Sequence, residues 1–208
     1  MTEKLQLLYR PTEPTSHAHF NERVRDELPR VIEANASAEL SCTLAEPPPR
    51  WSVVPFDRSP LALVSLLGER PEAVPRGMRV DAYRVETSAP LEGTRRVRLL
   101  TLFRRREGLD DQRFVERWHR GHTPLAIEVH PLEGYVRNVV QDSLGDAEPL
   151  DGIVEEHVAS VEDVVDPRRF FGRGKLGEAV INMAKVGWDV RGFIDLGSVK
   201  NYLLEGIG

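Results

Sequence analysis

The clearest candidate for chemistry in the sequence is His122, which lies in the run Gly121-His122-Thr123-Pro124. Proline opposes continuation of a helix because it lacks an N–H and crowds the preceding turn. We therefore predict a helix break at Gly121 to Thr123, with Thr123 capping a new turn and Pro124 at its first position. An imidazole at such a break can take up or release a proton near neutral pH. His122 is our predicted general acid or base; the alternative is a histidine that only ties the break to a backbone carbonyl.

Two further ionisable residues lie on one face of a predicted strand, Gly152–Val158. Side chains alternate between the two faces of a strand, so Glu155 and His157 share a face. If that face looks into a barrel, both side chains reach the same cavity as His122, where a carboxylate can orient an imidazole or bind substrate hydroxyls. We predict Glu155 and His157 as catalytic partners of His122. The alternative places them at a solvated strand end.

Four more residues are predicted to bind substrate. Tyr135 and Arg137 share a face of the neighbouring strand and can bind a phenolate or a carboxylate; the alternative is a cross-strand aromatic contact and a surface ion pair. Trp118 belongs to a helical stripe with the spacing of a core-facing surface. His119 lies beside it on the predicted helix, just before the break.

The sequence also contains two patterns that resemble metal or cofactor signatures. His119 and His122 are three residues apart, with Glu155 and His157 nearby in the predicted fold, which permits a metal site. The predicted break spoils the helical geometry that this spacing needs, so we expect no metal. The run Gly172–Gly177 matches a dinucleotide fingerprint in letters but follows a helix-like segment instead of a strand. We expect no organic cofactor.

An internal repeat organises the elements that must position these residues. Lys4–Tyr9 aligns with Leu99–Arg104, and Leu28–Glu33 aligns with Thr123–Glu128. Each half then continues with three short strand-like segments. These are Ala38–Leu44, Leu61–Leu67 and Val80–Glu86 in the first half, and Gly134–Val140, Gly152–Val158 and Val199–Glu205 in the second.

The order β-α-β-β-α-β is the ferredoxin-like unit, an antiparallel sheet with one helix-covered face and one bare face. We predict an α+β fold of two tandem ferredoxin-like repeats that bury their bare faces on each other as an intramolecular dimeric α/β barrel. Residues 1–92 form the first repeat and residues 93–208 the second. An insertion at about 173–198 carries a helix-like stretch, Glu178–Val186, that we interpret as a lid or edge cover.

Composition indicates a folded protein without attraction for nucleic acid or membranes. Hydrophobic residues make up 40% of the chain and charged residues 29%, which is typical of globular domains. The formal net charge of -5 offers nothing to phosphate backbones or anionic lipid, and no stretch has the uncharged length of a membrane span. We expect a cytoplasmic protein with a small-molecule ligand or substrate, no nucleic-acid or membrane partner, and room for a homodimer through outer surfaces. The single cysteine, Cys42, is expected to be a buried thiol.

Several short motifs in the second half occur in a recognisable order, and they span roughly residues 97 to 165. They are Phe103–Leu109, Phe114, Trp118-His119, His122–Leu125, Gly134–Asn138 and Asp151–Glu155. In these residues the second repeat resembles the EthD-domain family of dimeric α/β-barrel proteins. The first repeat resembles a degenerate form of the same fold, in which Glu27 occupies the position of His122.

The resemblance implies an EthD-like small-molecule enzyme that works by cofactor-independent acid/base chemistry on an aromatic or polyketide-like substrate. The reaction would be of the cyclase, decarboxylase or isomerase type. Two alternatives stay open. One is a non-catalytic ligand-binding or accessory protein of a degradation pathway, and the other is a monooxygenase of the α/β-barrel superfamily, with haem at His122 as one form of it. A shared fold by itself assigns no chemistry.

Overall fold

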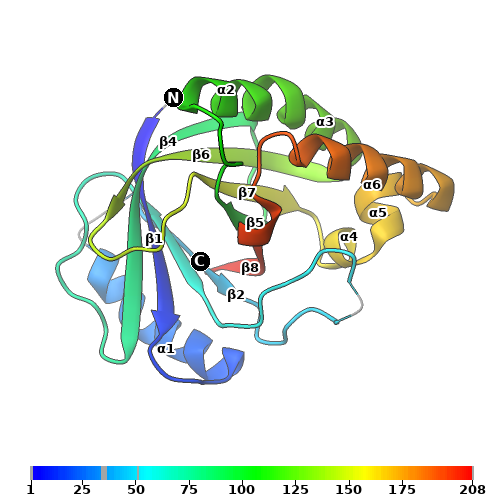
Figure 1. Cartoon of the computed structure of the whole chain (residues 1–208). Helices are drawn as coiled ribbons and strands as arrows, with labels where there is room; N and C mark the ends of the chain where they lie inside the picture. Colours follow the sequence, from blue (N-terminus) through cyan, green and yellow to red (C-terminus); the bar gives the residue numbers. More distant parts are fainter. Residues whose placement is uncertain (1, 34–36, 51, 208) are drawn as a thin grey trace.

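A closed barrel of eight antiparallel strands, with helices packed outside it, forms the mixed α/β fold of the protein (Figure 1). The computed structural model describes residues 2–33, 37–50 and 52–207. The strands are β1 (Thr2–Pro11), β2 (Glu39–Thr43), β3 (Ala62–Leu66), β4 (Met78–Leu91), β5 (Val97–Phe103), β6 (Leu132–Leu144), β7 (Gly152–Val158) and β8 (Lys200–Ile207). The helices are α1 (His17–Ile32), α2 (Asp111–Glu116), α3 (Thr123–Val129), α4 (Glu162–Val165), α5 (Pro167–Gly172) and α6 (Leu176–Val190), with a π-helical turn η1 (Arg117–His122) and a 3₁₀ turn η2 (Leu196–Ser198).

The strands follow the order β1-β3-β2-β8-β5-β7-β6-β4 around the barrel. Taken half by half, the order is β4-β1-β3-β2 for the first half of the chain and β8-β5-β7-β6 for the second. The halves join where β2 pairs with β8 and where β4 pairs with β6. The four strands of each half form one sheet, here called the first and the second sheet, and the two sheets close the barrel within one chain. Closure leaves no sheet edge unpaired.

The first half departs from the predicted ferredoxin-like unit, because the described chain has no helix between β3 and β4. The connection there contains Gly68 and Gly77, both with positive φ, and Pro71 and Pro75. Prolines and left-handed glycines favour turns over a helix. In Figure 1, α1 covers one side of the barrel, whereas the helices of the second half gather on another.

Alternation along each strand divides the buried side chains between the barrel interior and the helix-covered outer face. On β7, Ile153 packs inside the barrel with Leu8 and Leu100. Its neighbour Val154 packs outward, in a cluster that includes Phe103 and Trp118. Successive side chains of β7 therefore alternate between the barrel interior, where they contact the opposite half, and the outer face, where they contact the helices.

The predicted helix break before Pro124 is wrong. The chain stays helical from α2 through η1 into α3, and Thr123 has φ -57° and ψ -46°. The N–H of Thr123 bonds the carbonyl of Trp118, five residues earlier, and the Thr123 hydroxyl donates to the same carbonyl at 2.9 Å. The wider π turn accommodates Pro124, whose missing N–H would otherwise leave a regular helix with an unmatched carbonyl. Such π turns are frequent at functional sites.

The predicted insertion contains a real helix, and that helix is longer than expected. α6 extends over Leu176–Val190 where Glu178–Val186 was predicted. It packs against α5 and lies near η1 and α3, on the outer face of the second sheet (Figure 1). Within the described ranges, no helix is long and apolar enough to cross a membrane.

Candidate functional site

A cavity of about 230 Å³ lies between the outer face of the second sheet and the helices that cover it. Strands β5, β6, β7 and β8 form its floor, and η1, α5 and α6 with the segment after α6 form its walls. Most of the lining is aromatic or aliphatic. The aromatic members are Phe103, Trp118, Tyr135, Phe170, Phe171 and Phe193, and the polar members are Thr101, His122, His130, Glu156 and Asn201.

His122 reaches this cavity from the last position of the π turn. Its Nδ1 lies 2.8 Å from Oδ2 of Asp189 on α6. A carboxylate only accepts, so Nδ1 carries the proton and donates it to Asp189. When the ring carries this one proton, Nε2 is the acceptor atom. The ring packs on Phe193 with the centroids 5.3 Å apart, so packing as well as the hydrogen bond fixes its orientation.

Glu156 lines the same cavity from β7 and is 7% exposed. Among the described residues, no side chain or backbone group forms a hydrogen bond or an ion pair with its carboxyl group. Burial away from water disfavours the charged form, and it raises the pKa of Glu156 to about 8. At neutral pH the cavity therefore holds a mostly protonated carboxylic acid.

Tyr135 is the cross-strand neighbour of Glu156 on β6, and its hydroxyl accepts a hydrogen bond from Nε1 of Trp118 at 3.4 Å. Burial raises the pKa of Tyr135 above its usual value, and the nearby Glu156 raises it further. The phenol is therefore neutral, and it adds a polar point to the floor of an otherwise apolar cavity.

His130, just after α3, is a second imidazole in the cavity lining. Its Nδ1 is 3.0 Å from the carbonyl of Phe170 and donates to it, and the ring stacks on Phe170 with the centroids 4.0 Å apart. Burial lowers the pKa of His130 to about 4. This histidine is held neutral in a single tautomer, so it is suited to accepting a hydrogen bond.

The structure does not bring Glu155 and His157 to His122, which corrects the predicted grouping. Both point into the barrel interior, on the side of the sheet opposite the cavity. Glu155 accepts from Nη1 of Arg98 at 2.7 Å, from Asn138 at 3.2 Å and from Gln6 at 3.4 Å. Nδ1 of His157 accepts from the backbone N–H of Arg95 at 3.1 Å. These bonds join β7 to its neighbours and, through Gln6, to the opposite half of the barrel.

Arg137 and His119 also lie outside the cavity lining, although Trp118 and Tyr135 belong to it. Arg137 donates to the Thr123 hydroxyl at 3.1 Å and to Ser88 at 3.0 Å. It also reaches the carbonyl of His119 at 3.5 Å. Burial, with the charge of Arg137, lowers the pKa of His119 to about 4. Arg137 thus ties the π turn to the sheet and positions His122 indirectly.

Sequence reasoning missed three lining or supporting residues: Glu156, His130 and Asp189. Strand alternation places Glu156 on the face opposite Glu155, and it is the face of Glu156 that lines the cavity, whereas the face of Glu155 was predicted to do so. Asp189 lies in the insertion, more than sixty residues from its partner His122, so no local spacing pointed to it. Within the described part of the chain, no group of three or more His, Cys, Asp or Glu side chains is placed to hold a metal ion.

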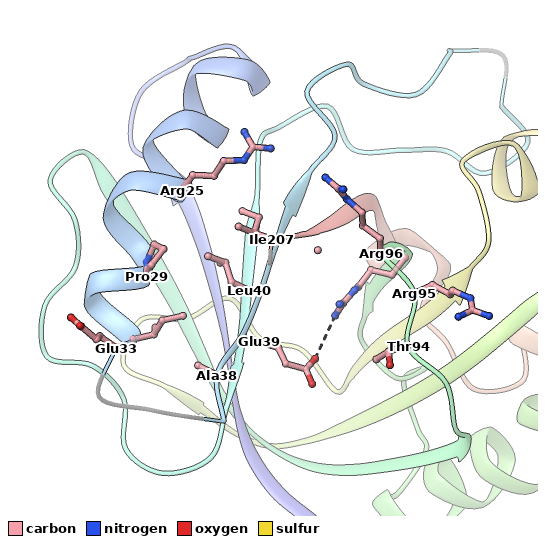
Figure 2. A pocket seen from close by; sticks show the side chains of 13 residues that line it. Arg25, Pro29, Glu33, Ala38, Glu39, Leu40, Thr94, Arg95, Arg96 and Ile207 are labelled. Carbon is pink, nitrogen blue, oxygen red and sulfur yellow. Dashed lines mark ion pairs between the residues drawn. The ribbon is translucent and has the colours of Figure 1, made fainter.

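A second hollow, of about 920 Å³, lies between α1, β2 and the segment before β5 (Figure 2). Arginines line its walls over an apolar floor that includes Leu40 and Ile207. Three of these arginines already face carboxylates. The pairs are Arg95 with Glu133, Arg96 with Glu205, and Arg98 with Glu155. Its charges are largely compensated, and none of the predicted site residues lines it.

These features define a fold of the dimeric α/β-barrel type, with the cavity between one sheet and its helices. Among solved structures, an "anthrone oxidase-like protein" matches with a TM-score of 0.63 at 10% identity, over 100% of this chain and 92% of that one. A "putative monooxygenase" from Lactobacillus acidophilus matches with a TM-score of 0.51 at 12% identity, over 99% of this chain and 94% of that one. No protein-family model and no curated protein matches the chain. At these identities the likeness establishes the fold alone.

Proposed function

We propose that this protein is a small-molecule enzyme that performs acid/base chemistry without a cofactor on an aromatic or polyketide-like substrate. The observation that carries the proposal is His122, oriented by Asp189 at 2.8 Å and presented to an aromatic cavity. A histidine held by a carboxylate at one ring nitrogen leaves the other nitrogen to act on substrate.

In this proposal, Nε2 of His122 removes a proton from the bound substrate, and Asp189 stabilises the imidazolium that results. Later in the cycle the imidazolium returns the proton to another atom of the substrate. The aromatic walls exclude water and strengthen each electrostatic contact. A cavity of about 230 Å³ is smaller than typical drug-sized sites, which favours a compact planar substrate.

We further infer that the chain consists of two tandem units of the EthD-like type. The shared internal strand order of the two halves supports this inference. The first unit would have lost the helix between its third and fourth strands, together with the histidine. Glu27, at the aligned position, bonds Arg23 on the same helix at 2.9 Å and lies outside the cavity lining.

A second candidate reaction is oxidation of the same class of substrate. The names of the two structural neighbours favour it, since one is called anthrone oxidase-like and the other a monooxygenase. Proton removal by His122 would begin this reaction as well, because an electron-rich phenolate or enolate is easier to oxidise than the neutral compound. Dioxygen would then be a second substrate.

The test follows depletion of hydroxylated naphthalenes, anthrones and aromatic β-ketones by absorbance, with an oxygen electrode in parallel. We expect His122→Ala to lower turnover by about 100-fold or more, and Asp189→Asn to lower it by a smaller factor. Glu27→Ala serves as the matched control and should behave as wild type. Oxygen uptake matched to turnover selects the oxidase candidate. Full turnover by folded His122→Ala would overturn both candidates, and tight binding without turnover by the wild type would establish a ligand-binding protein instead.

A further inference from the structure

Glu156 and Glu155 are adjacent on β7 and meet opposite surroundings. Glu155 is 4% exposed and accepts hydrogen bonds from Arg98, Asn138 and Gln6. Glu156 is 7% exposed and has no such partner among the described residues. A buried carboxylate that lacks a partner costs several kcal/mol, and in practice the group takes up a proton instead. The unpaired carboxyl group therefore has hydrogen-bonding capacity that only a cavity occupant can use.

The register of the sheet shows what flanks this carboxyl group. Glu156 pairs with Tyr135 on β6 and with Leu99 on β5, so one neighbour is a neutral phenol and the other an aliphatic side chain. The other titratable groups around the cavity are His130, His122 and its partner Asp189. No Lys or Arg side chain belongs to the described lining, so no lining cation stabilises a charged Glu156.

We propose that Glu156 acts as an uncharged carboxylic acid that donates a hydrogen bond to a carbonyl or enol oxygen of the substrate, which specifies an aromatic ketone or its enol tautomer as the substrate class. The inference rests on the proposed function and deepens it. Burial raises the pKa of Glu156 to about 8, as expected for a carboxyl group that is buried without a partner. A protonated carboxyl group has one O–H donor, and within the described residues that donor forms no hydrogen bond.

The proposal divides the chemistry between two sides of the cavity. His122 removes a proton from the carbon next to the carbonyl group. The electron pair of that C–H bond forms the carbon–carbon double bond of an enolate, and the π pair of the carbonyl group moves to its oxygen. Glu156 keeps its proton and donates it as a hydrogen bond, which strengthens as negative charge develops on the oxygen. His122 then returns its proton to the substrate. Glu156 is a catalytic residue in this scheme because it touches the reacting oxygen.

A binding experiment tests this role without requiring turnover. Acetophenone carries a carbonyl acceptor, and isopropylbenzene has a similar shape without one. We expect wild type to prefer acetophenone by about tenfold, as one hydrogen bond in an apolar site allows. Glu156→Gln keeps an N–H donor and should keep the preference, whereas Glu156→Leu should lose it. Equal preference in wild type and Glu156→Leu would overturn the role of Glu156.

An infrared measurement separates this proposal from the proposed function. At pH 7 the carbonyl band of a protonated carboxyl group should be present in wild type and in Glu155→Gln, and absent in Glu156→Gln. Absence of the band from wild type would overturn the inference while turnover could still depend on His122. Conversely, the band and the ketone preference would persist in a protein without turnover, so the two failures are distinguishable.

A different observation supports an interaction surface on α6. The face of α6 that points away from the cavity is apolar and open to solvent. Its large members are Leu176 (66% exposed), Val180 (58%), Ile181 (58%) and Trp188 (79%). The opposite face contributes Val186 and Val190 to the cavity lining. A helix that is apolar on both faces is expected to be covered on both.

We infer that a second copy of this chain covers the exposed face, with the two α6 helices antiparallel about a two-fold axis. When the axis passes near Asn182, Leu176 lies opposite Trp188 of the other helix and Val180 lies opposite Ala184. Glu178, which pairs with Lys175 of its own chain at 2.8 Å, flanks the apolar face on the same side as Lys185, so this alignment would bring Glu178 of one copy toward Lys185 of the other. Isologous contacts require this self-complementarity of shape and charge.

The mass in solution tests the pairing, by light scattering after size-exclusion chromatography. We expect a wild-type dimer and a monomer for Trp188→Glu, whereas Val74→Glu, at an exposed apolar residue (37%) outside α6, should stay dimeric. Glu178→Lys should weaken the dimer, and adding Lys185→Glu should restore it. A wild-type protein that is monomeric at about 100 µM, or a dimer that is unaffected by Trp188→Glu, would overturn the proposal.

Discussion

Replacing Glu156 by glutamine is expected to stabilise the protein at alkaline pH. Glutamine has nearly the shape of a protonated glutamic acid and cannot ionise. The folded-state pKa of Glu156, about 8, is above its ordinary value of 4.5. The wild type therefore has this group's full contribution to stability below about pH 4.5 and loses it progressively as the pH rises through 8. The variant has no corresponding loss.

The size of the effect follows from linkage, because one pKa unit corresponds to about 1.4 kcal/mol. A shift from 4.5 to about 8 gives an upper limit of about 5 kcal/mol above pH 8. At pH 5 the two proteins should differ by less than about 1 kcal/mol. The difference in free energy of unfolding should then grow in favour of Glu156→Gln up to about pH 8 and level off above it.

Urea unfolding followed by circular dichroism across pH 5 to 9 measures this difference. The neighbouring substitution Glu155→Gln is the matched control, since it weakens the pair with buried Arg98 and should destabilise the protein by about 3 kcal/mol. At pH 8 the same Glu→Gln substitution should therefore raise the free energy of unfolding at position 156 and lower it at position 155. Parallel stability curves for wild type and Glu156→Gln would refute the assignment of a buried, unpaired carboxyl group at this position.

Three further predictions concern the barrel and the helices packed on it. Gly93→Ala should destabilise the fold by about 2 kcal/mol or more in urea unfolding, because the added Cβ would lie 1.9 Å from the carbonyl oxygen of Glu133. Cys42, whose pKa burial raises to about 11, should resist iodoacetamide at pH 8 in the folded protein and react quickly in urea. Arg137→Met should lower turnover although the His122 side chain itself is unchanged, because the substitution removes the hydrogen bond to Thr123 that holds the π turn. A changed His122 NMR signal would report the displaced ring.

Much of the barrel could be predicted from the sequence. The alternating runs predicted β5 and β7 to within a few residues, and β6 in part, and the alignment of the two halves anticipated strands that lie in the same order within each sheet. These elements follow from local hydrophobic periodicity and turn residues, which tertiary contacts did not override. The helix break at Thr123 was wrong because a π turn resolves the missing N–H of Pro124 without ending the helix.

That β7 carries ionisable side chains on both faces follows from the amino-acid sequence alone, since a strand alternates whatever surrounds it. Which of the two faces lines the cavity depends on how the whole chain packs. The helices cover the face of Glu156, and the other face of β7 looks into the barrel. There Arg98 of the neighbouring strand and Gln6 of the opposite half donate hydrogen bonds to the carboxylate of Glu155. Likewise, the sequence marked His122 but not Asp189, because their contact depends on how α6 folds back over the sheet. Periodicity is a local property, whereas the covering of a face and the meeting of distant side chains arise only from packing.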